Sequence, residues 1–271
     1  MSKVQVFGWR DAPRATFAVL GDPISHTWSP LIQSAALADL GRPEQYVALH
    51  VPLEEFTEAV EHLRSIGYLG VNCTLPLKEV AFQWCEALEA HAHELGVVNT
   101  LNLPLRMGTN TDTLGFLETL RELEIKPPGP ILLLGAGGTA RSLIRTLANE
   151  GFDLRVYNRT PERAEQLLEE LELSFPVVQQ PVVGDNVMIL NTTSAGLSGS
   201  AIDVAWGKPP RGTVAYDVVY RQELTPFLAD AKLAGCRVID GRAMLVAQGA
   251  LALEWWLKVP VSREVMNRAL P

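Results

Sequence analysis

The chain has 271 residues, a formal net charge of −8 and a hydrophobic fraction of 47%. This length exceeds what one hydrophobic core usually holds, so we expect two domains. The negative charge argues against a nucleic-acid-binding surface, which needs a basic stripe, and no stretch approaches the roughly 20 apolar residues of a membrane span.

The cysteines and the first residues of the chain indicate its cellular compartment. Cys73, Cys85 and Cys236 are an odd number with no Cys-x-x-Cys pair, which favours buried thiols in a reducing cytoplasm. The start, Met1 to Val6, has no long apolar run before a small-residue cleavage site, so we expect no signal peptide. We therefore expect a cytoplasmic monomer or homodimer that binds a small-molecule substrate, with neither nucleic acid nor membrane as a partner.

The chain up to about residue 112 alternates apolar and amphipathic segments, as an α/β unit does. Ser29 is a natural helix N-cap, and Pro30 is a natural first helical residue. Phe56, Val60 and Leu63 fall on one face of a second helix. We expect strands over 15–20, 46–51, 70–74 and 97–103, a short strand before Asn110, and helices from Pro30 to about Leu40, over 53–65 and from Pro76.

The rest of the chain alternates strands and helices more regularly. The segment 131–134 is short and wholly apolar, as in a parallel sheet that is covered on both faces. Thr160 followed by Pro161 is typical of a helix start, and the proline-rich segment 127–130 is the strongest linker candidate. Further strands are expected over 154–157, 187–190, 214–217 and 237–239, and helices over 113–123, 139–149, from Pro161 and over 244–257.

This order predicts an α/β protein with an N-terminal α/β domain and a Rossmann-like, doubly wound second domain. We place the first domain at 1–112 and the second at 113–243. The remaining residues, 244–271, are expected to form C-terminal helices that return to the N-terminal domain.

A glycine-rich loop over 135–140 joins the 131–134 strand to the next helix. Gly135 permits a tight turn, Gly137 lets the backbone approach a pyrophosphate, and the small Ala140 allows the helix to pack closely on the strand. A turn without a ligand is the alternative, and the strand before the loop and the helix after it favour the dinucleotide site. The residues expected to contact the cofactor are Gly135, Ala136, Gly137, Gly138 and Thr139.

The segment Asn158 to Arg163 lies where a Rossmann domain selects between NAD and NADP. It begins twenty positions after Gly138, at the end of the second strand, where an acidic residue would bind the free ribose hydroxyl of NAD. Arg159 and Arg163 stand there instead, and a guanidinium suits a phosphate. Either arginine could also be a solvated surface charge. The segment predicts NADP (NADPH) as the cofactor, bound by Asn158, Arg159, Thr160 and Arg163.

Polar side chains gather at the predicted strand ends of the N-terminal domain. Thr27 and Ser29 stand at a helix start, where hydroxyls and free N–H groups can hold a carboxylate. Asn99 and Asp112 offer donors and acceptors for several hydroxyl groups.

These segments together resemble shikimate dehydrogenases across nearly the whole chain. The matching stretches cover 21–30, 72–78, 97–100, 110–112, 135–140, 158–160 and 244–248, in the family's order and spacing. The resemblance implies reversible reduction of 3-dehydroshikimate to shikimate with NADPH, in chorismate and aromatic amino acid biosynthesis.

The resemblance also implies roles for individual residues. It gives the catalytic pair as Lys78 and Asp112. It adds Val218 and Gly241 to the NADP contacts. The shikimate contacts that it implies are Thr27, Ser29, Asn72, Thr74, Asn99, Asp112, Tyr220 and Gln248.

Lys78 is the candidate proton donor, since an alcohol dehydrogenase must move a proton to or from the protein. Burial would lower its pKa and a neighbouring Asp112 would raise it. Alternatively, Lys78 is a surface lysine and Asp112 caps the following helix. Gln248 lies among apolar residues, where its amide needs either a substrate hydroxyl or a backbone carbonyl as its partner.

Other polar residues give weaker signals. We expect no metal site, because His91 and His93 are two positions apart without a third ligand, and we interpret both as solvated. His26 is interpreted as structural. Two rival functions remain: a broader quinate/shikimate dehydrogenase, and a non-catalytic NADP-binding regulatory protein.

Overall fold

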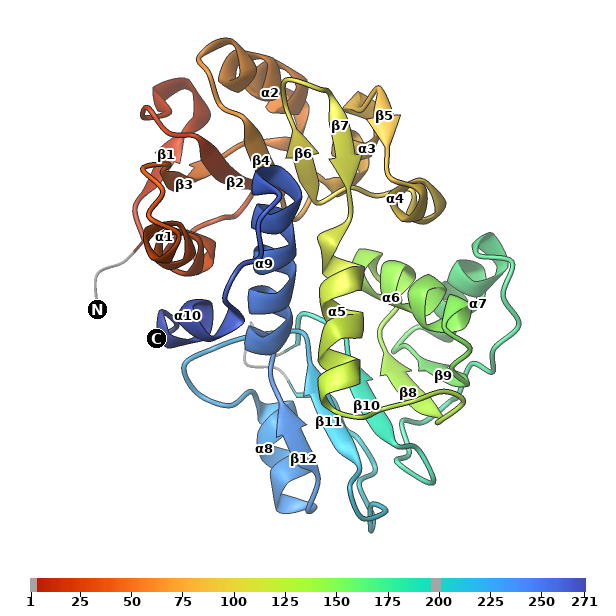
Figure 1. The fold of residues 1–271 in the computed structure, drawn as a ribbon. Helices are drawn as coiled ribbons and strands as arrows, with labels where there is room; N and C mark the ends of the chain where they lie inside the picture. The colour runs from red at the N-terminus through yellow and green to blue at the C-terminus, as the bar shows by residue number, and fades with distance from the viewer. Residues whose placement is uncertain (1–3, 196–200) are drawn as a thin grey trace. The chain divides into compact units, whose positions relative to one another are not determined.

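The computed structural model describes residues 4–195 and 201–271, and the chain divides into two compact units. One unit contains the chain up to Phe116 together with Leu245–Pro271, and the other contains Leu117–Met244. Between the units the chain runs through α5 (Thr111–Glu122) and α9 (Arg242–Leu257) (Figure 1). The division therefore falls inside two helices, and not at the proline-rich segment 127–130 where the sequence favours a linker.

A seven-stranded mixed sheet forms the centre of the first unit, in the order β1-β3-β2-β4-β6-β7-β5. The strands β1, β3, β2 and β4 pair in parallel, whereas β6 is antiparallel to both β4 and β7. Every residue of β2 and β4 is buried, which explains why these strands are largely apolar. The strands are β1 (Val6–Gly8), β2 (Phe17–Gly21), β3 (Tyr46–His50), β4 (Gly70–Cys73), β5 (Ala87–Leu88), β6 (Thr100–Asn102) and β7 (Met107–Thr109).

The helices of the first unit follow the predicted order with shifted starts. The predicted apolar face of the second helix is confirmed, since Phe56, Val60 and Leu63 are buried. Two predicted starts are wrong: Trp28 occupies the N-cap position and Ser29 is already helical, and the third helix begins at Lys78 after a turn. The helices are α1 (Ser29–Asp39), α2 (Phe56–Ser65), α3 (Lys78–Trp84), α4 (Ala90–Leu95) and α10 (Arg263–Arg268), with 3-10 turns at Trp9–Asp11 and Leu53–Glu55.

A five-stranded sheet of parallel strands forms the second unit, in the order β12-β11-β10-β8-β9. The chain leaves β8 toward β9 on one side and then adds β10 on the other side, so β8 and β10 flank a topological switch point. The predicted Rossmann-like architecture is confirmed. Its elements are β8 (Ile131–Leu134), α6 (Gly138–Asn149), β9 (Leu154–Tyr157), α7 (Pro161–Glu170), β10 (Met188–Asn191), β11 (Val214–Asp217), α8 (Pro226–Leu233) and β12 (Arg237–Ile239).

The register of this sheet aligns the last residues of four strands. Leu134 pairs with Tyr157 on one side and with Asn191 on the other, and Asn191 pairs with Asp217. The loops that follow this row therefore start at one edge of the sheet. That edge, at the carboxyl ends of the strands, is where open α/β sheets bind ligands.

Among the described residues, no helix is both long enough and apolar enough to cross a bilayer.

Candidate active site

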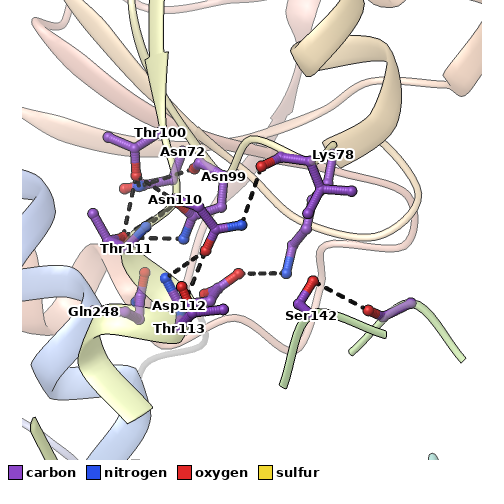
Figure 2. A network of polar contacts seen from close by, with 12 residues as sticks. Asn72, Lys78, Asn99, Thr100, Asn110, Thr111, Asp112, Thr113, Ser142 and Gln248 are labelled. Carbon is purple, nitrogen blue, oxygen red and sulfur yellow. Dashed lines mark hydrogen bonds and ion pairs between the residues drawn. The ribbon is translucent and has the colours of Figure 1, made fainter. Parts of the chain in front are cut away.

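Lys78 and Asp112 form an ion pair in the first unit. Lys78 is the first residue of α3, Asp112 is the second residue of α5, and Lys78 Nζ donates to Asp112 Oδ2 at 2.6 Å (Figure 2). The two side chains are 31% and 18% exposed. The pair is thus partly buried and still accessible, which is the environment that a proton-transferring group needs. Lys78 is therefore paired and only partly exposed, and its catalytic role stays a prediction.

Asp112 does not cap its helix. Asn110 occupies that position, because its Oδ1 accepts from Asp112 N at 3.1 Å and from Thr113 N at 3.3 Å. A side-chain oxygen that accepts from the second and third helical N–H groups is an N-cap. The Asp112 carboxylate is therefore free to face Lys78.

A buried amide network lies beside this pair (Figure 2). Asn99 Oδ1 accepts from Thr111 N at 2.8 Å, and Asn99 Nδ2 donates to Thr111 Oγ1 at 3.0 Å. This leaves one Nδ2 hydrogen of Asn99 without a partner among the described residues. Asn99 can thus anchor α5 and still donate to a substrate hydroxyl.

Asn72 is placed differently from Asn99. Its Nδ2 donates to Asn99 O at 3.2 Å and to Thr100 Oγ1 at 2.9 Å, and its Oδ1 accepts from the Tyr46 hydroxyl at 2.7 Å. Asn72 is 6% exposed, and both of its amide hydrogens are used within the protein. Asn72 thus supports Asn99, and its predicted contact with the substrate stays a prediction.

The two loops that carry the predicted hydroxyls are adjacent. Asp22 N donates to Leu75 O at 3.0 Å, and a Cβ on Gly21 would lie 2.5 Å from the Thr74 side chain. This joins the loop before α1 to the loop before α3. Thr27 and Ser29 are buried, and Ser29 N donates to Thr27 Oγ1 at 3.2 Å. That contact leaves the Thr27 hydroxyl hydrogen available to a ligand.

Gln248 lies close to the helix that carries Asp112. A Cβ on Gly115, one turn after Asp112, would lie 2.6 Å from Gln248 N, so α5 and α9 approach closely in the first unit. Gln248 Nε2 donates to Leu245 O at 2.9 Å, which is the backbone partner that the sequence left open. Tyr220 belongs to the second unit, and its predicted contact with the substrate stays a prediction.

His91 corrects one interpretation and adds a residue that the sequence analysis missed. It is partly buried, and its Nε2 lies 3.0 Å from Asn110 O, 3.2 Å from Thr109 Oγ1 and 3.4 Å from Asn110 N. It is therefore not a solvated histidine. In the sequence, its spacing from His93 pointed only to a possible metal site. Among the described residues, no three or more His, Cys, Asp or Glu side chains form a group that could hold a metal ion.

The glycine loop of the second unit lies at the topological switch point. Gly135 has φ +119°, and a Cβ there would lie 2.6 Å from Thr192 Oγ1, so the fold itself requires this glycine. A Cβ on Gly137 or Gly138 would meet nothing within 4 Å. Packing does not explain these two glycines, whereas an uncovered backbone at the start of α6 fits a phosphate group. Ala136 and Thr139 are partly buried in the same loop.

The arginine segment begins one residue after the aligned row of strand ends. Arg159 and Arg163 are exposed, and neither guanidinium pairs with an acidic side chain in the described part of the chain. Asn158 Nδ2 donates to Thr160 O at 2.8 Å, which ties the turn together. Arg159 and Arg163 are thus free to bind an anion.

A buried polar group supports the same edge of the sheet, and the sequence analysis did not identify it. Asp217 is fully buried and accepts from Asn191 Nδ2 at 3.0 Å, from Val219 N at 3.0 Å and from the Thr225 hydroxyl at 2.6 Å. Burial raises the pKa of Asp217 above its ordinary value. Gly241 packs against this turn so closely that a Cβ would overlap the carbonyl oxygen of Val218.

Segments of the chain match the models of three protein families. Residues 19–101 match the shikimate dehydrogenase substrate binding domain, and residues 127–195 match shikimate / quinate 5-dehydrogenase. Residues 241–270 match the shikimate 5'-dehydrogenase C-terminal domain.

Relatives match along nearly the full length. A shikimate dehydrogenase (NADP(+)) of Desulfitobacterium hafniense is 36% identical over 263 residues, which cover 94% of this chain and 96% of the relative. Its counterpart in Thermus thermophilus is 40% identical over 243 residues, with coverage of 89% and 91%. A crystal structure of the T. thermophilus enzyme in complex with NADP(H) and shikimate matches with a TM-score of 0.86 at 37% identity, covering 94% of this chain and 98% of that chain.

Proposed function

Because the chain belongs to the shikimate dehydrogenase family, we propose that it catalyses the reversible, NADPH-dependent reduction of 3-dehydroshikimate to shikimate. The observation that carries the proposal is the partly buried ion pair of Lys78 and Asp112 beside the donor of Asn99. A proton donor and hydroxyl-binding groups in one place suit the reduction of a ketone on a polyhydroxylated acid.

In this proposal, Lys78 donates a proton to the ketone oxygen when the alcohol forms, and takes it back in the reverse reaction. When bound, the nicotinamide cofactor supplies or accepts the hydride. Asp112 keeps the ammonium of Lys78 in place through the 2.6 Å contact and accepts from a substrate hydroxyl with its remaining lone pairs.

The remaining substrate contacts in the proposal come from the same unit. Thr27 and Ser29 would bind the substrate carboxylate at the start of α1, where hydroxyls and N–H groups favour an anion. Asn99, Thr74 and Gln248 would bind ring hydroxyls. Asn72 could join them only as an acceptor through its Oδ1, because both of its amide hydrogens bond within the protein.

The residues of the second unit fit NADP. The open backbone at Gly137 and Gly138 would hold the pyrophosphate, and the unpaired Arg159 and Arg163 would hold the phosphate that distinguishes NADP from NAD. Asn158 directly follows β9 and Val218 directly follows β11, and we expect both to contact the cofactor together with Thr160 and Gly241. A cytoplasmic location and a monomeric or homodimeric state stay predictions from the sequence.

A spectrophotometric assay at the nicotinamide band tests the function directly. We expect reduction of NADP by shikimate, with much slower rates for NAD. The family match to shikimate / quinate 5-dehydrogenase makes quinate the second candidate substrate, so both substrates should be measured with both cofactors. Equal or faster turnover of quinate with NAD would refute the substrate and cofactor assignment.

Two variants of Lys78 separate proton transfer from structure. Lys78→Ala should lower turnover by about 10²–10⁴, the usual contribution of a positioned acid–base group. Lys78→Arg keeps a cation for Asp112 but cannot readily release a proton, so it should also be slow. The exposed Lys232 of α8 supplies a control, since Lys232→Ala should leave turnover unchanged. Normal turnover by Lys78→Arg would remove the proton-transfer role.

A further inference from the structure

We propose that Asn110 is a positioning residue for the reaction: it fixes the start of α5 so that the Asp112 carboxylate stays on Lys78. The inference rests on the proposed function of the Lys78–Asp112 pair. Asn110 itself is 1% exposed, so its effect is expected to pass through Asp112 and not through a contact with the substrate.

Two side chains bind the free N–H groups at the start of α5. The first four N–H groups of a helix have no partner inside the helix. Thr111 N donates to Asn99 Oδ1 at 2.8 Å, and Asp112 N and Thr113 N donate to Asn110 Oδ1 at 3.1 and 3.3 Å. Two asparagine side chains thus bind three consecutive N–H groups, and the group in the middle belongs to Asp112.

Asn110 is itself fixed from two sides. Its Nδ2 donates to Val97 O at 3.2 Å. His91 Nε2 lies 3.0 Å from Asn110 O and 3.4 Å from Asn110 N, and the tautomer of His91 decides which of the two contacts is a hydrogen bond. The cap is therefore tied to the loop before β6 and to α4, and it cannot rotate freely.

Helix capping and the contact with Lys78 are performed by different residues. Many helices begin with an acidic residue that caps the helix with its own carboxylate. In this chain Asn110 performs the capping, and Asp112 N is bound while the Asp112 carboxylate remains free for Lys78 at 2.6 Å. Catalytic groups lose activity when they move by a fraction of an ångström, so the anchor of Asp112 bears on the rate.

The test compares Asn110→Ala with Asn110→Ser. Alanine removes the acceptor, whereas serine keeps a neutral oxygen that can cap the helix. We expect Asn110→Ala to lower kcat at least tenfold with an unchanged KM for NADP, and Asn110→Ser to recover most of the rate. With shikimate deuterated at the reacting carbon, the isotope effect on kcat should increase in Asn110→Ala, because the chemical step then limits turnover.

A matched control separates positioning from loss of stability. Ser262 caps α10 in the same unit, where its Oγ accepts from Val265 N at 3.3 Å. Ser262→Ala should therefore lose a helix cap without losing rate.

The inference fails if Asn110→Ala keeps the wild-type kcat, or if folded Asn110→Ser is as slow as Asn110→Ala. A wild-type chain without activity on shikimate would instead contradict the proposed function, so the two failures can be distinguished.

Discussion

The glycine loop allows a prediction that separates protein stability from cofactor affinity. Gly137 has ordinary negative φ at the start of α6, and a Cβ there would meet nothing within 4 Å. Gly137→Ala should therefore fold normally, with a free energy of unfolding that is unchanged or up to about 1 kcal/mol higher because the unfolded chain loses freedom. The added methyl group would instead occupy the space in front of the free N–H groups of α6.

The loss of cofactor affinity can be worked out from that geometry. A hydrogen bond to a charged group contributes about 1.5–3 kcal/mol, so the loss of one N–H contact with a phosphate should weaken NADPH binding by about 10- to 150-fold. Gly135→Ala is the contrasting variant. Its φ of +119° and the 2.6 Å approach to Thr192 Oγ1 should lower the free energy of unfolding by at least about 1–3 kcal/mol.

Two measurements on each variant test whether Gly137 serves cofactor binding and Gly135 serves folding. Urea unfolding gives the stability, and fluorescence titration with NADPH gives the dissociation constant without reference to turnover. Tight NADPH binding by Gly137→Ala would refute the assignment of the loop as the pyrophosphate site. A destabilisation of Gly137→Ala as large as that of Gly135→Ala would refute the distinction between an open and a packed glycine.

Two further outcomes follow from buried contacts. Because burial raises the native pKa of Asp217, the native state binds this proton more tightly than the unfolded chain, and its stabilising effect is lost as the pH rises through the native pKa. Asp217→Asn should therefore be more stable than the wild type at neutral pH and lose that advantage below the unfolded pKa of about 3.9. Urea unfolding measures the free energy of unfolding of both proteins at pH 4 and pH 7, and an equal difference between them at the two pH values would contradict this prediction. A Cβ in Gly115→Ala would press on the backbone of Gln248, so the variant should be less stable by about 1–3 kcal/mol and should have a higher KM for shikimate. An unchanged KM would show that α9 takes no part in binding shikimate.

The strands of the second unit were predictable because each is a short apolar run in a parallel sheet. The expected ranges 131–134, 154–157, 214–217 and 237–239 coincide with β8, β9, β11 and β12. The sequence also carried the signal for α8, since Thr225 before Pro226 repeats the pattern of Thr160 before Pro161, and Thr225 Oγ1 accepts from Leu228 N. The short strands β1 and β5 lack a periodic pattern long enough to detect.

Sequence motifs identified the predicted site residues, whereas the residues that hold them in place became evident only from the structure. A motif names Lys78 and Asp112, but no spacing shows that Asn110 caps the helix in place of Asp112. His91 meets Asn110 across nineteen positions, and Asp217 meets Asn191 across twenty-six. Such pairings follow from strand order and register, which a linear pattern does not contain.

The amide of Asn99 has a consequence for which changes the chain can tolerate. Its oxygen receives the first backbone hydrogen of α5, and its nitrogen retains one hydrogen that nothing in the described protein uses. An aspartate of the same shape would still receive the backbone hydrogen, but it would have none to offer and would place a second anion near Asp112. Under the proposed function, replacing this one nitrogen by oxygen would keep the start of α5 bonded and would remove the donor for a substrate hydroxyl.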